Sequence, residues 1–328
     1  MIKSDKIKVK IMESSINTIN YNYFNRQEHY NNDELSFTEY SLPYQHRPFG
    51  VNNIIIKECH SFKEIIVEFS GKILKHNYFE LISINTLNEV ESLISNSVVS
   101  LKPGSLADAQ LLWMDVTNDL HLLEKIQTYI SMLYYFRINH KYIARKYDND
   151  GITFIKDCKT PAFKDRILFY DKQLELLKSK DMVTFVAPDR FENVLRVECN
   201  LKTFPQLRRH LKLDSEVITL AQALGSTQPV NYNILCDITD KYDISFVLEN
   251  QDRSLHQIEK HEGRKIIIEK LNNDPKLYRK FIKDHLSGGS NPSYYNRQYK
   301  EILTDNLGRL EDHKNQLLIE IKNKLLAV

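Results

Sequence analysis

Three short stretches of the chain carry residue types that could cut and rejoin a phosphodiester bond. Each stretch alternates apolar and polar residues, which predicts a β-strand with one apolar and one polar face. If the three strands share one sheet, Asp115, Tyr170 and Glu198 share its polar face. The stretches are LLWMDVT (111–117), RILFYDK (166–172) and VLRVECNLK (194–202).

The chemistry of this predicted polar face is that of a nucleophile beside metal ligands. Asp115 and Glu198 can supply carboxylate oxygens to Mg²⁺ or Mn²⁺. Such an ion would neutralise the charge that grows on a phosphodiester under attack. The Tyr170 phenol, with an ordinary pKa of about 10, needs a metal ion or Lys172 to ionise at neutral pH. Arg196 carries a planar guanidinium suited to a phosphate oxygen.

The same pattern also has a purely structural interpretation. Antiparallel sheets commonly have one solvated face, and charges of both signs are the normal residues on it. A tyrosine or a carboxylate on such a face needs no function. Spacing alone does not separate the two interpretations.

The other predicted elements are short strands, hairpin turns and one long helix. This mixed order predicts an α+β fold with an antiparallel sheet flanked by helices. Residues 53–60 and 64–70 are expected to form a hairpin, and a polar loop rich in Tyr and Asn precedes them. The remaining expected elements are strands 6–12 and 152–156, and helices 85–96 and 122–142.

The character of the chain changes beyond about Leu213. The segments 262–271, 277–286 and 299–326 are charged and helix-periodic, and SGGSNP (287–292) breaks the chain between two of them. We therefore expect two domains. Residues 1–213 would carry the polar face, and residues 214–328 would form a mainly helical accessory region for DNA binding or dimerisation.

Composition excludes several classes of protein. The net charge is only +2, so the overall charge does not indicate a nucleic-acid or membrane partner. The four cysteines form no C-x-x-C pair and are expected to be reduced thiols of a cytoplasmic protein. No apolar run is long enough to span a membrane, so no membrane partner is expected. The absence of GxxxxGK[ST] and GxGxxG disfavours a P-loop ATPase or a dinucleotide-binding fold.

The three stretches, in this order, resemble motifs of the replication initiators of filamentous phages (gene II/X product-like) and small rolling-circle plasmids. That family shows an R-I-D-x-T-like strand, a [YI]-x-K-x-x-E-L-like segment and an L-x-R-x-E-x-x-[LI]-like strand. A fourth stretch is similar to the family's S-x-x-K-x-L-x-G-x-N segment, and the similarity covers about residues 67–213. The matching stretches are WMDVT (113–117), FYDKQLEL (169–176), VLRVECNLK (194–202) and VEFSGKILKHNYF (67–79).

This resemblance implies a DNA-nicking enzyme with a rolling-circle nickase-like fold. It maps the nucleophile onto Tyr170 and acidic residues onto Asp115 and Glu198, with Glu175 as a further ligand or base. Tyr170 would become joined to a 5′ phosphate and leave a 3′-OH primer, and later rejoining would need no ATP. The implied cofactor is Mg²⁺ or Mn²⁺. The implied partners are origin DNA, a host helicase and a polymerase, with a homodimer as an option.

The chain departs from the family's pattern at two points. Met114 stands where the first motif usually carries an arginine, so a phosphate contact there is lost or supplied elsewhere. No H-x-H sequence occurs, although many rolling-circle nickases have one. Metal binding by paired histidines is therefore not expected.

Origin recognition has to come from local basic residues, because the overall field is weak. In KLYRK (276–280) and YYNRQYK (294–300), basic residues alternate with aromatic ones that could contact phosphates and stack on bases. The alternative is a solvated helix face with ordinary lysines. The candidate DNA-binding residues are Lys72, Lys202, Arg208, Arg209, Lys276, Arg279 and Arg297.

Two other functions remain open from the sequence. HEGR (261–264), followed by Tyr294, Tyr295 and Tyr299, suggests a tyrosine recombinase. That class requires a second arginine in a helical catalytic domain. The other option is a non-catalytic DNA-binding protein that keeps only the sheet.

Overall fold

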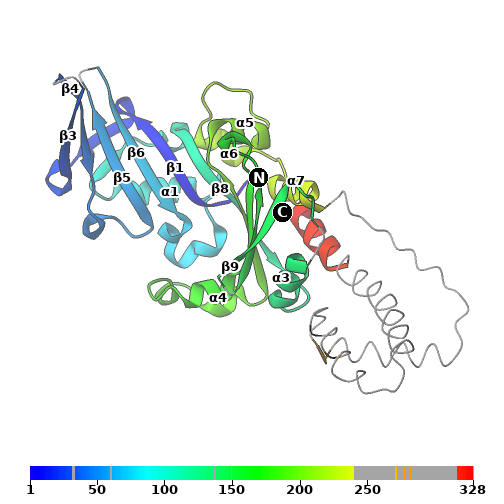
Figure 1. Ribbon diagram of the computed structural model, residues 1–328. Coiled ribbons are helices and arrows are strands. Elements are labelled where there is room, and N and C mark those ends of the chain that lie inside the picture. The colour runs from blue at the N-terminus through cyan, green and yellow to red at the C-terminus, as the bar shows by residue number, and fades with distance from the viewer. Residues whose placement is uncertain are drawn as a thin grey trace, which may run out of the picture.

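A large antiparallel sheet with helices packed against it forms the centre of this computed structural model (Figure 1). The predicted mixed α+β class is therefore confirmed. The structure describes residues 1–31, 34–59, 61–135, 138–148, 150–239, 270, 271, 277, 281 and 316–327.

The sheet of ten strands has the order β3-β4-β5-β6-β1-β8-β12-β11-β10-β9. The three strands with the motifs, β8, β12 and β11, are consecutive and pair antiparallel. A separate pair consists of β2 (Ile16–Ile19) and β7 (Val99–Leu101). The ten strands are β1 (Ser4–Met12), β3 (Asn25–Asn31), β4 (Glu34–Ser41), β5 (Val51–Glu58), β6 (Lys63–Ser70), β8 (Gln110–His121), β9 (Tyr142–Tyr147), β10 (Gly151–Lys156), β11 (Arg166–Asp171) and β12 (Val194–Leu201).

Helices surround the central strands. Among the described residues, no helix combines the length and the apolar character that a membrane crossing requires. Residues 316–327 are helical, and residues Gly71–Glu80 form a 3-10 segment, η4. The other helices are α1 (Leu87–Ser95), α2 (Ser105–Asp108), α3 (Ile126–Tyr135), α4 (Lys172–Leu177), α5 (Phe204–Leu211), α6 (Leu220–Gly225) and α7 (Val230–Thr239).

The core follows from the alternation of the central strands. Ile7 of β1, Val116 of β8, Val197 of β12 and Ile167 of β11 lie in one buried apolar cluster. Residues of α3, α5, α6 and α7 belong to the same cluster, so these helices cover the apolar face of the sheet. The polar residues of β8, β12 and β11 must then lie on the opposite face, since neighbouring side chains of a strand alternate.

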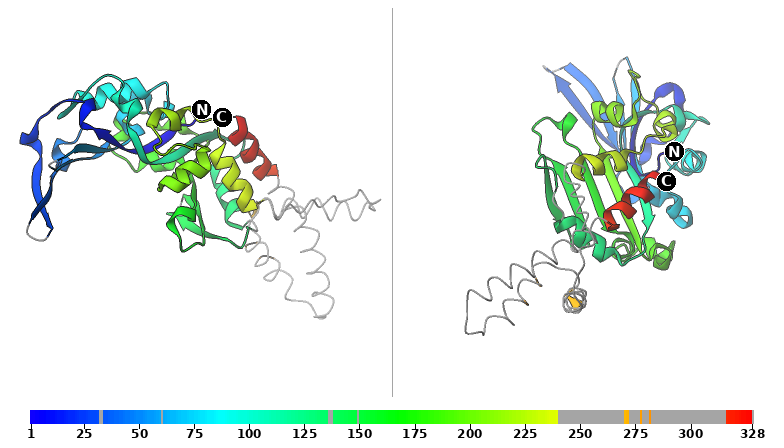
Figure 2. Two further views of the ribbon diagram at one scale, coloured as in Figure 1. Left: turned by 90° about the horizontal axis from the view of Figure 1, so that it is seen from above. Right: turned by 90° about the vertical axis from the view of Figure 1, so that its right-hand side faces the viewer.

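The core also extends past the domain boundary predicted at residue 213. Leu224 of α6 and Leu235 of α7 are fully buried in it, and Ile321 of the helix 316–327 joins them. The first residues of the chain lie beside that helix (Figure 2). Residues 1–213 therefore do not hold the whole core by themselves, whereas most of the predicted accessory region lies outside the described residues.

The predicted hairpin is present as β5 and β6, but two other predicted elements differ. The segment predicted as a polar loop before residue 53 contains β2, β3 and β4. All but one residue of β3 are exposed, so this edge strand lacks the apolar alternation that identifies a strand. The helix predicted to reach Tyr142 is described as α3 up to Tyr135, and Tyr142 instead begins β9.

Candidate active site

Tyr170 lies on the polar face of the sheet, and its phenol contacts Glu198. In the pairing of β11 with β12, Tyr170 is opposite Arg196 and Leu168 is opposite Glu198. Tyr170 Oη donates a hydrogen bond to Glu198 Oε1 over 2.8 Å. Tyr170 is 5% exposed and Glu198 is 8% exposed. The predicted shared face is present, but here it is buried rather than solvated.

Burial also changes the acidity of this pair. Burial, and then the nearby Asp5, raise the pKa of Glu198 from 4.5 to about 7. Burial, and then Glu198, raise the pKa of Tyr170 well above its usual value. Tyr170 is therefore a neutral phenol that donates a hydrogen bond to Glu198. A carboxyl group with a pKa near neutrality is suited to act as a general base for the hydroxyl it contacts.

Two further carboxyl groups, those of Asp115 and Asp5, belong to the same cluster. Asp115 is opposite Asn200 in the β8–β12 pairing and accepts a 2.6 Å hydrogen bond from Asn200 Nδ2. Burial raises the pKa of Asp115 to about 6 despite this hydrogen bond, and Asp5 adds to the shift. Asp5 comes from β1, where the register against β8 shifts between Ser4 and Ile7. Such a bulge re-aims a side chain, and here it adds a third acidic group.

These three carboxyl groups have the donor types that fit Mg²⁺ or Mn²⁺. Asp5 Oδ1 is buried and has no hydrogen-bond partner. Gly71 packs closely against it, because a Cβ at that position would lie only 2.9 Å from Asp5 Oδ1. Within the described part of the chain, however, no three His, Cys, Asp or Glu side chains are arranged so that they could hold a metal ion by themselves. Waters and substrate phosphate oxygens usually complete a magnesium site that has few carboxylates.

Arg196 is buried under this cluster and is bound by other side chains. Its Nε and Nη2 donate to the two carboxylate oxygens of Asp119 over 2.6 and 2.7 Å, and its Nη1 donates to Tyr78 Oη over 2.8 Å. Burial opposes its charge, but Asp119 outweighs burial and raises the pKa of Arg196. The predicted phosphate contact does not fit this position, because Arg196 is 0% exposed. We therefore treat Arg196 as a positioning residue.

Lys172 begins α4 and does not continue β11, which ends at Asp171. Its Nζ donates to Tyr78 Oη over 2.6 Å and to Glu175 Oε2 over 2.5 Å. Burial is the largest of the effects that lower the pKa of Lys172. The ammonium group lies 5.7 Å from the centre of the Tyr170 ring. Glu175, predicted as a metal ligand or base, is thus paired with Lys172.

Three residues of the site were missed by sequence reasoning. Asp119 continues the polar alternation of 113, 115 and 117, so a strand predicted two residues longer would have included it. Tyr78 comes from the 3-10 segment η4, where no periodicity marks a face. Asp5 faces the site only because of the bulge in β1, which leaves no signal in the sequence.

The pair of Asp119 with Arg196 gives a stability prediction. Asp119→Asn should lower the free energy of unfolding by about 3 kcal/mol, because it removes the bidentate counter-ion of the buried guanidinium and leaves only the longer, 3.5 Å ion pair with Asp5 Oδ2. Denaturant unfolding of the full chain measures this change. The matched control is Asp214→Asn, which breaks a surface pair of Asp214, 102% exposed, with Arg208. Its expected cost is under about 1 kcal/mol, and equal costs for both variants would contradict the prediction.

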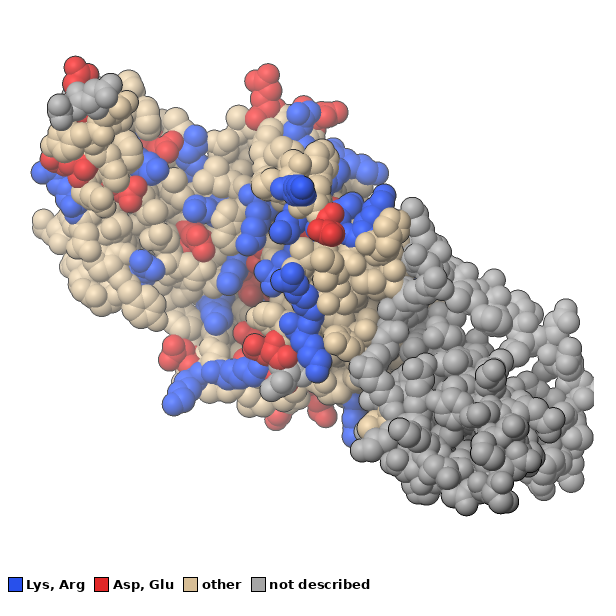
Figure 3. All heavy atoms as spheres, viewed as in Figure 1, with Lys and Arg blue, Asp and Glu red and all other residues tan. Residues whose placement is uncertain are grey.

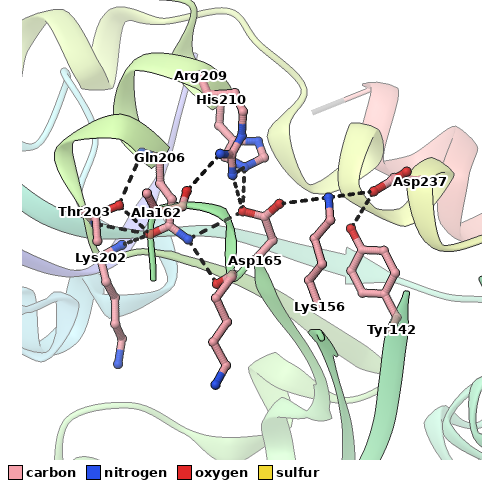
Figure 4. Close-up of polar contacts among 11 residues, drawn as sticks. Tyr142, Lys156, Ala162, Asp165, Lys202, Thr203, Gln206, Arg209, His210 and Asp237 are labelled. Atoms are coloured by element: carbon pink, nitrogen blue, oxygen red, sulfur yellow. Dashed lines mark hydrogen bonds and ion pairs between the residues drawn. The ribbon is translucent and has the colours of Figure 1, made fainter. Parts of the chain in front are cut away.

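Among the predicted DNA-binding residues, Arg209 is bound to the protein itself. Its Nη2 lies 2.5 Å from Asp165 Oδ1, and His210 Nε2 lies 2.9 Å from the same oxygen (Figure 4). Arg209 Nη1 also donates to the carbonyl of Ala162. Lys202, in contrast, extends away from this cluster in Figure 4. Arg209 therefore helps to anchor α5, whereas Lys202 is available to a ligand.

The other predicted DNA-binding residues also differ in whether they form an ion pair with a described residue. Arg208 pairs with Asp214 over 2.9 Å at the surface. Lys72 is half-buried and Lys202 is exposed, and neither forms an ion pair with a described residue. The remaining candidates, Lys276, Arg279 and Arg297, lie outside the described residues.

No family model, curated protein or solved structure matches this chain. The segment behind the recombinase alternative, residues 261–264 with Tyr294, Tyr295 and Tyr299, lies outside the described residues.

Proposed function

We propose that this chain nicks and rejoins origin DNA as the replication initiator of a rolling-circle plasmid or phage. The observation that carries the proposal is the 2.8 Å hydrogen bond from Tyr170 Oη to Glu198 Oε1. A nucleophile in hydrogen-bond contact with a base whose pKa lies near neutrality is the usual arrangement for covalent catalysis. The four motifs that resemble those of rolling-circle initiators support the same reaction.

The proposed reaction is a transesterification at phosphorus. Glu198 accepts the phenol proton while Tyr170 Oη attacks the phosphorus of a phosphodiester in single-stranded DNA. The bond from phosphorus to the 3′ oxygen breaks, and that oxygen takes up a proton from water to become a 3′-OH. The 5′ phosphate stays on Tyr170. A new 3′-OH, which gives up its proton to water, then attacks the phosphotyrosine and rejoins the strand, and Tyr170 recovers its proton from Glu198.

The acidic cluster would hold the Mg²⁺ or Mn²⁺ of this reaction. Asp115, Glu198 and Asp5 would bind it together with waters and phosphate oxygens, and the ion would supply neutralising charge to the phosphate. Arg196 and Lys172 both donate hydrogen bonds to the Tyr78 hydroxyl and so fix the Tyr78 side chain in the site. Glu175 keeps the buried ammonium of Lys172 paired.

Access to Tyr170 requires a movement, because only 5% of this residue is exposed. The ring of Tyr147, the last residue of β9, lies 6.0 Å from the Tyr170 ring, centre to centre. Lys172 at the start of α4 covers another side. We expect DNA binding to displace one of these side chains, as substrate-driven opening and closing does at many enzyme sites.

The proposed partners follow from the products of the reaction. A free 3′-OH is a primer, so a host polymerase would extend it and a host helicase would open the duplex ahead. The reaction would take place in the cytoplasm, where these partners act. A homodimer would allow one protomer to cut while its partner rejoins.

Capture of a covalent complex tests the proposal. The full chain is incubated with Mg²⁺ or Mn²⁺ and single-stranded oligonucleotides that tile the replicon encoding it, and the modified peptide is mapped. A 5′-phosphotyrosine adduct on Tyr170 is the expected result. An adduct within residues 294–299 would instead indicate the recombinase, and no adduct on any oligonucleotide would leave a non-catalytic DNA-binding protein.

A further inference from the structure

Trp113, the only tryptophan of the chain, lies half-buried on the same polar face as the candidate active site. It belongs to β8, two residues before Asp115, and it is opposite Lys8 of β1. No ring or cation among the described residues packs against its indole. A large aromatic side chain on a polar face, without an aromatic partner, is suited to stack on a base.

Cations without counter-ions surround this part of the face. Lys6 and Lys202 are exposed and lie close enough to Asp115 for their charges to affect its pKa. The charges of Lys6 and Lys72 lower the pKa of Asp5, after the larger effects of burial and of Arg196. None of these three lysines forms an ion pair with a described residue, unlike Lys8, which lies 4.0 Å from Glu68. Figure 3 shows Lys and Arg gathered in a band across the middle of the molecule.

Along β12, the polar side chains from Glu198 through Asn200 to Lys202 lie progressively farther from Tyr170. Glu198 contacts Tyr170, Asn200 contacts Asp115, and Lys202 follows the last residue of the strand. Four residues of strand span about 13 Å at about 3.3 Å each. On the neighbouring strand, Met114 pairs with Leu201, so Trp113 comes level with Lys202. The stacking surface and the cations therefore lie a few nucleotides from the proposed nick.

We propose that single-stranded DNA lies across the polar face of β1, β8 and β12, with one base stacked on Trp113 and its phosphates bound by Lys6, Lys72 and Lys202. This inference deepens the proposed function and depends on it for the direction of the strand toward Tyr170. A duplex does not fit the arrangement, because its bases already stack on one another and present no free face to the indole. Flat sheet surfaces with an exposed aromatic bind unpaired bases in this manner.

Tryptophan fluorescence can report stacking on Trp113 directly, since all tryptophan fluorescence of the protein comes from this residue. Titration of the full-length protein with a 15-nucleotide oligothymidylate should quench this emission in a saturable manner. A blunt duplex of the same length should quench it far less. A 15-nucleotide oligouridylate distinguishes the sugar: quenching by both single strands supports a surface that reads bases and phosphates alone. Absence of quenching by either single strand would overturn the inference.

Variants separate the stacking contact from the phosphate contacts. With a fluorescein-labelled oligothymidylate, Trp113→Ala should weaken binding roughly 5- to 100-fold, and Trp113→Phe less, because a phenyl ring still stacks. Lys202→Ala and Lys6→Ala should each reduce the slope of log affinity against log salt by about 0.7. Lys180→Ala is the control, because this exposed lysine lies outside the strands, and its slope should not change. Equal slopes for all three lysine variants would remove the phosphate role.

Failure of this inference can be told apart from failure of the proposed function. Tyr170→Phe should keep the full quenching of Trp113, because the phenol oxygen is not part of the stacking surface. Quenching without any tyrosine adduct would leave a single-strand binding surface and reject the nicking reaction. An adduct on Tyr170 without quenching of Trp113 would keep the reaction and reject this path for the strand.

Discussion

Tyr170→Phe is expected to abolish nicking and covalent capture of DNA while binding to single-stranded DNA persists. The substitution removes one oxygen atom, the one that donates to Glu198 over 2.8 Å. Loss of a nucleophile typically costs on the order of 10⁶ in rate, so activity should fall to background. Gel-resolved cleavage of a labelled oligonucleotide and mass spectrometry of the adduct measure the two losses.

Tyr147→Phe is the matched control for this experiment. Tyr147 lies next to Tyr170, with ring centres 6.0 Å apart, but no hydrogen bond joins its hydroxyl to a described residue. Nicking should continue in this variant. Tyr78→Phe tests the other buried phenol of the site, which contacts Lys172 and Arg196 rather than the base. Cleavage at the full rate by Tyr170→Phe would refute the assignment of the nucleophile.

Glu198→Gln is expected to have two opposite effects, loss of activity and gain of stability. The amide cannot accept the phenol proton, and loss of a general base typically costs about 10² to 10⁴ in rate. In the native chain, activity should rise as the pH increases through about 7, because this is the pKa of Glu198 and only its ionised form is a base. The rate of nicking from pH 5 to 9 measures this profile, and the variant should not show it.

The sign of the stability effect follows from the same shift. The folded-state pKa of Glu198, about 7, lies above the usual value of 4.5. The folded protein therefore holds this proton more tightly than the unfolded chain, and Glu198 makes stability fall as the pH rises from 4.5 to about 7. At pH above 7 the cost reaches roughly 3 kcal/mol. Glu198→Gln should recover much of it at alkaline pH and little at pH 4.

Glu192→Gln is the control for both effects, because Glu192 is exposed in the turn before β12. Neither its activity nor its denaturation midpoint should change. If Glu198→Gln were less stable than the native chain at pH 8, the ionised carboxylate would be a stabilising group. The interpretation of Glu198 as a base with a raised pKa would then be rejected.

The alternation of the sequence was sufficient to predict the central strands and their faces. Val116, Val197 and Ile167 alternate with Asp115, Glu198 and Arg166, and a pleated strand turns that order into two faces. The same rule placed Tyr170 and Glu198 on one side without any knowledge of the register. It failed for β3, whose residues are almost all exposed, because an edge strand without a buried face shows no alternation.

Other features of the site depend on contacts between distant parts of the chain. The sequence determined which groups face away from the core: a phenol, two carboxyl groups and their cationic neighbours. Only the tertiary structure decided that they are buried, that Arg196 binds Asp119 instead of facing a ligand, and that the bulge in β1 adds Asp5. The reason is that a strand's own period sets the direction of its side chains, whereas burial and pairing depend on the segments that pack over it. One of those segments, η4, is far from β12 in the sequence and has no regular periodicity.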